Sequence, residues 1–150
     1  MRCETYNEHP LYEVADIVPL ADELLLFIPM RYQILSVAFV TEETICSLHK
    51  QFLNDPTPTD VITFPDDEDN SERTGEICIS VDEALKYVHL HSLEQELTLY
   101  LVHGWLHLAG YDDLNEIDQR VMRMMEQKTL QFLSTQPVKE VHIRRKGTPK

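Results

Sequence analysis

The alternation of apolar and polar positions predicts strands and short helices in the first part of the chain. The apolar stretch 17–28 favours a helix, because Pro19 lies in its first turn, where a missing N–H does little harm. The segment "QILSVAFV" (33–40) is apolar and rich in β-branched residues, as expected of a buried strand. The same reasoning predicts a helix capped by Thr41 with Ile45, Leu48 and Phe52 on one face, strands at 60–65 and 76–80, and a short helix at 81–88.

The second part of the chain predicts two long helices. Ser92 begins the first of them with a capping box, "SLEQ", in which Gln95 is the third helical residue. From there to residue 109 the sequence is apolar almost all round, which is typical of a buried central helix, and Gly110 is suited to end it. A final helix is expected at 114–133. The pattern as a whole predicts an α+β fold, with a small mixed β-sheet packed with helices.

Length and composition favour one domain without a membrane segment. The 150 residues are enough to bury a hydrophobic core, and the 43% of apolar residues can supply it. The N-terminal "MRCETYNEHP" lacks the apolar stretch of a signal peptide. The longest apolar run, "LLLFI", is far shorter than the roughly 20 residues that span a bilayer. We therefore expect a cytoplasmic protein that has no membrane partner.

The formal net charge of −13 is unevenly distributed along the chain. From Pro137 onward there are five cations and one anion, so residues 137–150 carry +4 and residues 1–136 carry −17. An acidic body repels nucleic acid at long range, so a nucleic-acid role must depend on local features. We expect residues 1–136 to form a single domain. Residues 137–150 are expected to be a basic, flexible C-terminal tail, with an electrostatic arm as the alternative.

The cysteines exclude one class of metal site. Cys3, Cys46 and Cys78 are widely spaced, and no two of them form a C-x-x-C pair. This argues against a disulfide framework and against a thiolate zinc site. Any metal must therefore be held by nitrogen and oxygen ligands.

Two histidines in the apolar helix supply such ligands. His103 and His107 are four residues apart, so their imidazoles lie on one face of a helix and can reach one ion. Gly110 lets the chain turn back, and Asp113 then follows at a position where its carboxylate could be a third ligand. The pattern H-x-x-x-H-x-x-G-x-x-D matches the ligand and glycine spacing of metzincin zinc peptidases, with aspartate in place of the last histidine. We therefore predict a zincin-like metal helix.

The acidic residues of this region also have structural alternatives. Asp113 could cap the last helix, with Glu116 completing a capping box, and Asp112 is a second candidate for either role. Asp60, which opens a strand after "PTPT", is most simply a turn residue that bonds local N–H groups.

Gly104 occupies the place of the glutamate that serves zinc peptidases as general base. Peptide hydrolysis by that route is therefore disfavoured. Glycine inside a helix costs about 1 kcal/mol relative to alanine, so a reason for it is expected, and one is room for a bulky substrate above the ion. Phosphodiester hydrolysis remains open, because there the ion itself can polarise a phosphoryl oxygen or supply hydroxide.

Three segments together resemble a known family. "HGWLHLAGYDD" (103–113) resembles the H-G-x-L-H-L-x-G-Y-D-H signature of the YbeY family of bacterial metal-dependent endoribonucleases. "PTDVITFP" (58–65) and "GEICIS" (75–80) resemble that family's P-T-D-V-L-S-F-P and G-D-I-x-I-S segments, in the same order and spacing. The similarity covers roughly residues 32 to 133.

The resemblance implies a compact α+β fold that holds one zinc ion per chain through three histidines. It implies cleavage of single-stranded RNA, maturation of the 3′ end of small-subunit ribosomal RNA, and a part in ribosome quality control. The implied partners are ribosomal RNA with ribosomal small-subunit proteins or assembly GTPases. On this chain the ligand positions fall on His103, His107 and Asp113.

The chain departs from the family pattern at two positions. Asp113 replaces the usual third histidine, which adds one negative charge, weakens the ion as a Lewis acid and favours harder metals. Leu53 stands where many members have an arginine that is thought to position phosphate, and Arg73 or the basic tail is the candidate substitute.

We therefore expect a zinc-dependent endoribonuclease acting on ribosomal RNA precursors. One alternative is a non-catalytic ribosome-assembly factor with a structural metal, which predicts four protein ligands and no open position. The other is a metzincin-like zinc peptidase, which the missing glutamate disfavours.

Overall fold

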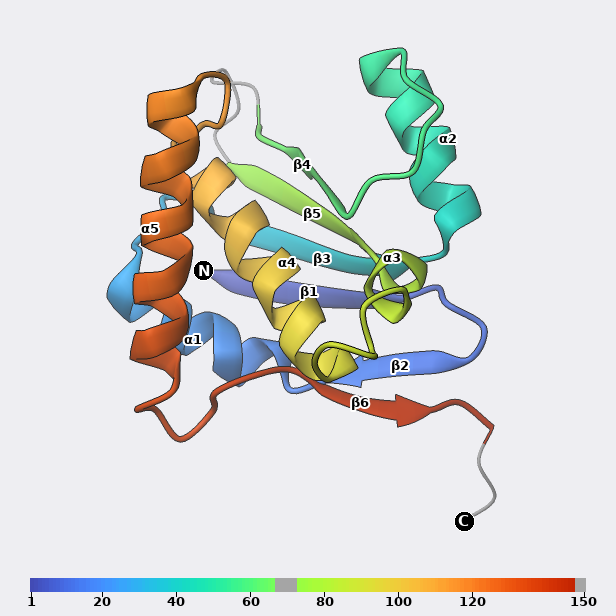
Figure 1. Cartoon of the computed structure of the whole chain (residues 1–150). Coiled ribbons are helices and arrows are strands. Elements are labelled where there is room, and N and C mark those ends of the chain that lie inside the picture. The colour runs from blue at the N-terminus through green and yellow to red at the C-terminus, as the bar shows by residue number, and fades with distance from the viewer. Residues whose placement is uncertain (67–72, 148–150) are drawn as a thin grey trace.

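A mixed four-stranded sheet forms the centre of the fold (Figure 1). The computed structural model describes residues 1–66 and 73–147. The sheet has the order β1-β3-β5-β4, in which the first three strands run parallel and β4 is antiparallel to β5. The predicted α+β class with a mixed sheet is confirmed. Its strands are β1 (Arg2–Asn7), β3 (Ile34–Val40), β4 (Val61–Phe64) and β5 (Thr74–Ser80).

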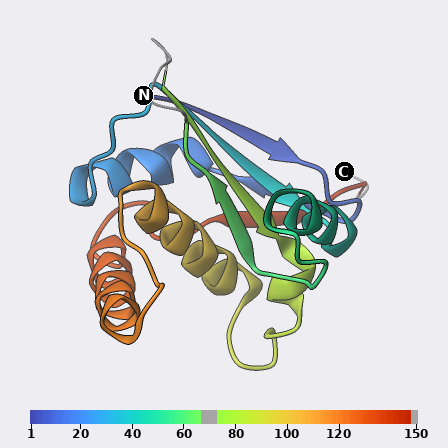
Figure 2. The ribbon, with the colours of Figure 1, turned by 90° about the horizontal axis from the view of Figure 1, so that it is seen from above.

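Helices cover both faces of this sheet. α1 and α4 lie on one face, and α5 packs outside them against both, as a further layer (Figure 2). α2 packs on the other face, over β4 and β5. None of the described helices combines the length and apolarity that crossing a membrane requires. The helices are α1 (Ile17–Phe27), α2 (Glu42–Leu53), α3 (Val81–Leu85), α4 (Leu93–Leu108) and α5 (Glu116–Leu133).

The two faces of β5 show why the sheet can bury side chains on both sides. Ile77 and Ile79 are fully buried in the main core with α1, α4 and α5, as their alternation predicts. Cys78 points the other way and packs with Ile45 of α2 in a smaller cluster. In the main core the indole of Trp105 donates to the carbonyl of Ile28 over 3.0 Å, which ties α4 to the end of α1.

The ends of α4 follow the sequence signals. The Ser92 hydroxyl accepts from the Gln95 N–H and the Gln95 side chain accepts from the Ser92 N–H, so the predicted capping box is present. At the other end Gly110 has φ +107°, and the Tyr111 N–H donates to the Leu106 carbonyl over 2.9 Å. This is the glycine-dependent helix end that the sequence predicts, and it turns the chain back beside α4.

A second, two-stranded sheet differs from the sequence expectation. β6 (His142–Arg145) pairs antiparallel with β2 (Tyr12–Ala15), although the basic C-terminal segment was expected to be flexible. Val141 is fully buried in the main core, and its N–H donates to the Thr98 hydroxyl over 3.1 Å. The pairing with β2 and the burial of one apolar residue order a segment whose charge alone predicted a solvated tail.

Candidate metal centre

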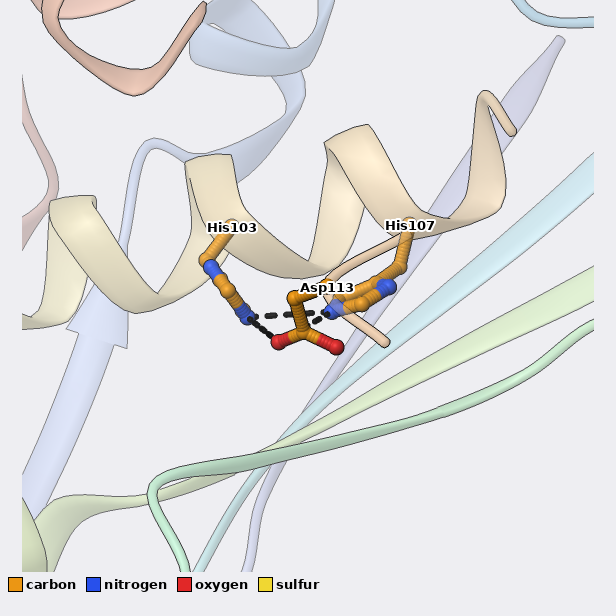
Figure 3. A group of neighbouring side chains, drawn as sticks. All are labelled: His103, His107 and Asp113. Carbon is orange, nitrogen blue, oxygen red and sulfur yellow. Dashed lines mark hydrogen bonds and ion pairs between the residues drawn. The ribbon is translucent and has the colours of Figure 1, made fainter. Parts of the chain in front are cut away.

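Three side chains converge beside the C-terminal half of α4 (Figure 3). The Nε2 atoms of His103 and His107 lie 3.0 Å apart. Oδ2 of Asp113 lies 3.7 Å from Nε2 of His103 and 3.5 Å from Nε2 of His107. Among residues 1–66 and 73–147, these are the histidine, cysteine and acidic side chains whose donor atoms group closely enough to share one ion. The structure thus brings together the three residues that the sequence nominates.

The spacing of the donor atoms fits a tetrahedral ion. Zinc–nitrogen and zinc–oxygen bonds of about 2.0–2.2 Å place neighbouring donors roughly 3.3–3.6 Å apart in a tetrahedral shell. Of the observed separations, 3.5 Å lies within that range, 3.0 Å lies below it and 3.7 Å lies above it. Two imidazoles and one carboxylate are also the donor types that zinc accepts. The residues present therefore fit a divalent cation of this kind without rearrangement of the backbone.

One side of the group is open to solvent. The side chains of His103 and His107 are 21% and 22% exposed, whereas that of Asp113 is 44% exposed. Asp112, the other candidate for closing the site, is exposed and does not belong to the group. Three protein donors with an open side resemble a catalytic site more than a structural one, which is normally closed by four protein ligands.

Asp113 is not the cap of α5. That helix begins at Glu116, and the Asn115 side chain accepts from the Asp118 N–H over 2.8 Å. The capping alternative is therefore wrong, because Asn115 is the N-cap of α5. The Gln119 side chain instead donates to the backbone carbonyl of Asp113 over 3.2 Å, which helps to fix the loop.

Glu126 of α5 holds His103 in place, and sequence reasoning missed this residue. Its Oε2 lies 2.7 Å from Nδ1 of His103. This contact directs the other ring nitrogen, Nε2, toward the group, as carboxylates commonly do for metal-ligating histidines. A signal was present in the sequence: Glu126 interrupts the apolar face of α5, four residues after Met122 and three before Thr129, both of which are buried.

The same contact changes the acid–base properties of His103. Burial alone would lower the pKa of His103, but the hydrogen bond and the charge of Glu126 outweigh it. The charges of Asp60 and Asp113 act in the same direction, so the pKa of this imidazole is raised above its usual value. In the ion-free protein His103 therefore holds a proton more strongly, and a metal must displace that proton to bind.

Asp60 is bonded locally, as its position in a turn predicts. Its Oδ1 accepts from the Val61 N–H over 2.8 Å and lies 3.3 Å from the Thr59 hydroxyl. It acts on the site through its charge, because it contributes to the raised pKa of His103.

Gly104 faces the sheet and not the open side of the site. A Cβ built there would lie 2.8 Å from Cγ2 of Ile77, 3.2 Å from Cγ2 of Val61 and 3.3 Å from Cγ2 of Thr63. The expectation that this glycine makes room for a substrate is therefore wrong. Its role is to allow the close approach of α4 to β4 and β5.

Comparison with known sequences identifies the family. A sequence profile described as "Endoribonuclease YbeY" matches residues 11–134, which is most of the chain. The chain belongs to the YbeY endoribonuclease family. Cleavage of RNA by hydrolysis is thus the activity of the family in which this metal-compatible site occurs.

Individual YbeY relatives agree with this assignment. The "Endoribonuclease YbeY" of Protochlamydia amoebophila is 39% identical over 126 residues, which cover 80% of this chain and 84% of the relative. That of Carboxydothermus hydrogenoformans is 36% identical and covers 79% and 85%. A solution structure of TM1509 from Thermotoga maritima matches with a TM-score of 0.54 at 25% identity, over 87% of each chain.

The residues considered as replacements for the missing YbeY arginine lie in defined places. Leu53, at the end of α2, is 61% exposed. The Arg73 guanidinium lies over the ring of Tyr32, 5.0 Å from its centroid. In the basic tail, Arg144 pairs with Glu13 at 3.0 Å, so this cation is engaged within the second sheet. None of these contacts places a cation among the three donor atoms.

Proposed function

We propose that this YbeY-family chain is a zinc-dependent endoribonuclease that cuts single-stranded RNA. We further propose that it matures the 3′ end of small-subunit ribosomal RNA and takes part in ribosome quality control. The observation that carries the proposal is the convergence of His103, His107 and Asp113 on one solvent-open point. Membership of an endoribonuclease family supports RNA as the substrate that this site acts on.

His103, His107 and Asp113 would hold a divalent cation, which would supply Lewis acidity for phosphodiester hydrolysis. Glu126 accepts a hydrogen bond from Nδ1–H of His103 and so keeps the Nε2 lone pair directed at the site. Asp113 adds a negative charge that a third histidine would not, which reduces the Lewis acidity and favours harder metals.

The charge of the chain bears on how RNA reaches this site. Residues 1–136 carry a net −17, so free RNA is repelled at long range. Recruitment through a ribosomal partner would overcome this repulsion. We therefore propose that the chain works in the cytoplasm on ribosomal RNA together with ribosomal small-subunit proteins or assembly GTPases.

The proposal is tested by metal content and RNA cleavage in matched variants. Asp113→Ala and His107→Ala are compared with the wild type and with Asp112→Ala, which removes a neighbouring exposed carboxylate outside the donor group. Bound zinc is measured after dialysis, and cleavage is followed on end-labelled single-stranded and duplex RNA. We expect the wild type and Asp112→Ala to hold one zinc and to cut single strands, and the other two variants to lose both properties.

Three results would contradict the proposal. Full zinc content in Asp113→Ala would remove this residue from the ligand set. A zinc-loaded wild type that leaves every RNA intact would favour the ribosome-assembly factor with a structural metal. Cleavage of casein would favour the peptidase, which the position of Gly104 against Ile77 disfavours further, because a glutamate there would collide with β5.

A further inference from the structure

A cavity of about 540 Å³ lies between the first half of α4, the end of α5 and the segment that precedes β6. Its volume is within the roughly 300–1,000 Å³ that small-molecule sites occupy. It is lined by Leu99 and Leu130, by Glu96 and His91, and by Ser134 and Lys139, among others. None of these residues belongs to the metal-compatible group.

This cavity begins one helical turn from the candidate metal centre. Leu99 precedes His103 by four residues on α4, so both side chains lie on the same face, about 6 Å apart along the axis. Leu130 follows Glu126 by four residues on α5, and Glu126 is the residue that contacts His103. The two helices pack side by side (Figure 1), so the cavity and the metal centre lie along the same pair of helices.

The lining combines apolar walls with a buried carboxylate. Leu99 and Leu130 offer aliphatic surface from opposite helices. The Glu96 side chain is only 9% exposed, and its Oε1 lies within hydrogen-bond distance of His91 Nε2. Tyr100 also bonds this carboxylate. An ionised carboxylate has about four acceptor positions, so Glu96 can accept further hydrogen bonds from a ligand.

We infer that this cavity is a nucleotide subsite that takes a base of the RNA strand next to the phosphate being cut. The inference rests on the proposed function. The base lies between Leu99 and Leu130, its exocyclic amino group donates to Glu96, and Lys139 at the rim faces the backbone phosphate.

A carboxylate in this position discriminates among the bases. Cytosine, adenine and guanine each carry an exocyclic amino group that can donate to Glu96. Uracil has carbonyl oxygens on both sides of its single N–H donor, and these are repelled by a carboxylate. The subsite therefore prefers cytosine to uracil, two bases of the same size that differ in the amino group.

Binding of CMP and UMP to the metal-free full chain tests the subsite without any cleavage. We expect CMP to bind about tenfold more tightly than UMP in a calorimetric or NMR titration. Glu96→Gln should reduce this preference to about twofold or reverse it, because an amide can donate to a uracil oxygen. The matched control is Glu94→Gln, which removes a carboxylate from the same turn of α4 outside the cavity. Thermal denaturation of each variant confirms that it is folded.

The outcomes separate this inference from the proposed function. Equal affinity for CMP and UMP, no binding of either, or an unchanged preference in Glu96→Gln would overturn the subsite. A wild type that binds CMP selectively but cuts no RNA would instead contradict the proposed nuclease. In a cleaving enzyme, we expect the cut sites on a mixed-sequence RNA to disfavour uridine at one neighbouring position, and Glu96→Gln to remove that bias.

Discussion

Glu126 shows how a single residue on one helix can set the chemistry of another. The Glu126 carboxylate lies 2.7 Å from Nδ1 of His103, and the Glu126 side chain is only 16% exposed. The contact fixes which nitrogen of the ring is protonated, and so which nitrogen faces the metal centre. The ligands themselves are local in sequence, within eleven residues, but their orientation depends on a residue 23 positions away.

Replacing Glu126 with glutamine should therefore weaken metal binding. We expect zinc affinity to fall about 10- to 100-fold, since the amide neither carries the charge nor fixes the ring in the same way. The measurement is a competition titration with a chromophoric chelator. Glu116→Gln on the same helix is the control, because its side chain is 82% exposed. Equal zinc affinities in the two variants would show that Glu126 does not support the site.

The spacing of residues along the chain predicts the two histidine ligands but not the role of Asp113. His103 and His107 are predictable because residues four apart on a helix share a face whatever surrounds them. Asp113 was open to two interpretations, because the same residue type caps helices and binds metals. The choice depends on Asn115, whose side chain takes the cap in the folded chain.

At the scale of elements, the contact of α4 with the sheet depends on the absence of a side chain at Gly104. A methyl group there would lie 2.8 Å from Cγ2 of Ile77, which is fully buried and cannot withdraw easily. The metal-binding helix is thus held at a distance from β5 that only glycine permits.

Gly104→Ala should therefore destabilise the protein although alanine is the better helix former. We expect a loss of about 1–3 kcal/mol in the free energy of unfolding from overpacking, partly offset by helix propensity. Urea denaturation measures it. In a double-mutant cycle with Ile77→Ala, the two losses should be less than additive, because the smaller side chain removes the collision. Strict additivity would mean that the contact with Ile77 is not the cause.

A second contact between elements centres on Asp82 at the start of α3. Its Oδ2 accepts from the Glu42 N–H at the start of α2 over 2.7 Å, and its Oδ1 lies 2.8 Å from Nε2 of His9. Partial burial opposes the charged form, but these two hydrogen bonds outweigh it and lower the pKa of Asp82 below its ordinary value of 3.8. A carboxyl whose pKa is lower in the folded chain stabilises the fold above pH 3.8 and loses that effect as the pH falls further.

Asp82→Asn should consequently cost stability at neutral pH and progressively less in acid. The midpoints of urea denaturation for the wild type and the variant are compared from pH 7 to pH 3. We expect a clear difference near pH 7 that shrinks below pH 3.8, where the wild-type carboxyl becomes protonated. Asp22→Asn, at an exposed position of α1, serves as control. A difference that stays constant over the whole range would contradict the role of the charge.

At the scale of the whole molecule, the segment after Gln136 packs against the main core and covers part of it. Val141 is fully buried, Lys146 Nζ donates to the Asn7 carbonyl over 2.9 Å, and β6 completes the second sheet. Thus β2, near the N-terminus, and β6, near the C-terminus, pair with each other although they are far apart in sequence.

Truncation after Gln136 should therefore unfold part of this arrangement. We expect the free energy of unfolding to drop by at least about 2 kcal/mol, from the loss of one buried aliphatic side chain and of the pairing with β2. Thermal and urea denaturation report the change. Lys139→Ala, an exposed change in the same segment, should have little effect. Wild-type stability in the truncated chain would restore the expectation of a flexible tail.

The sequence alone determined the features that depend on neighbours along the chain. These are the capping box at Ser92, the glycine end at Gly110, the alternation in β5, and the two histidines on one helical face. Helix geometry and turn chemistry act over a few residues, so local pattern is enough to predict them.

Only the tertiary structure decided the contacts between residues that are distant in sequence. It brought Glu126 to His103, turned Gly104 toward Ile77, and ordered β6 against β2. Each of these depends on which elements become neighbours when the core is buried. Burial is favourable for any apolar surface and carries no direction, so the pairing of elements is set by the packing of the whole chain and cannot be read from a short segment.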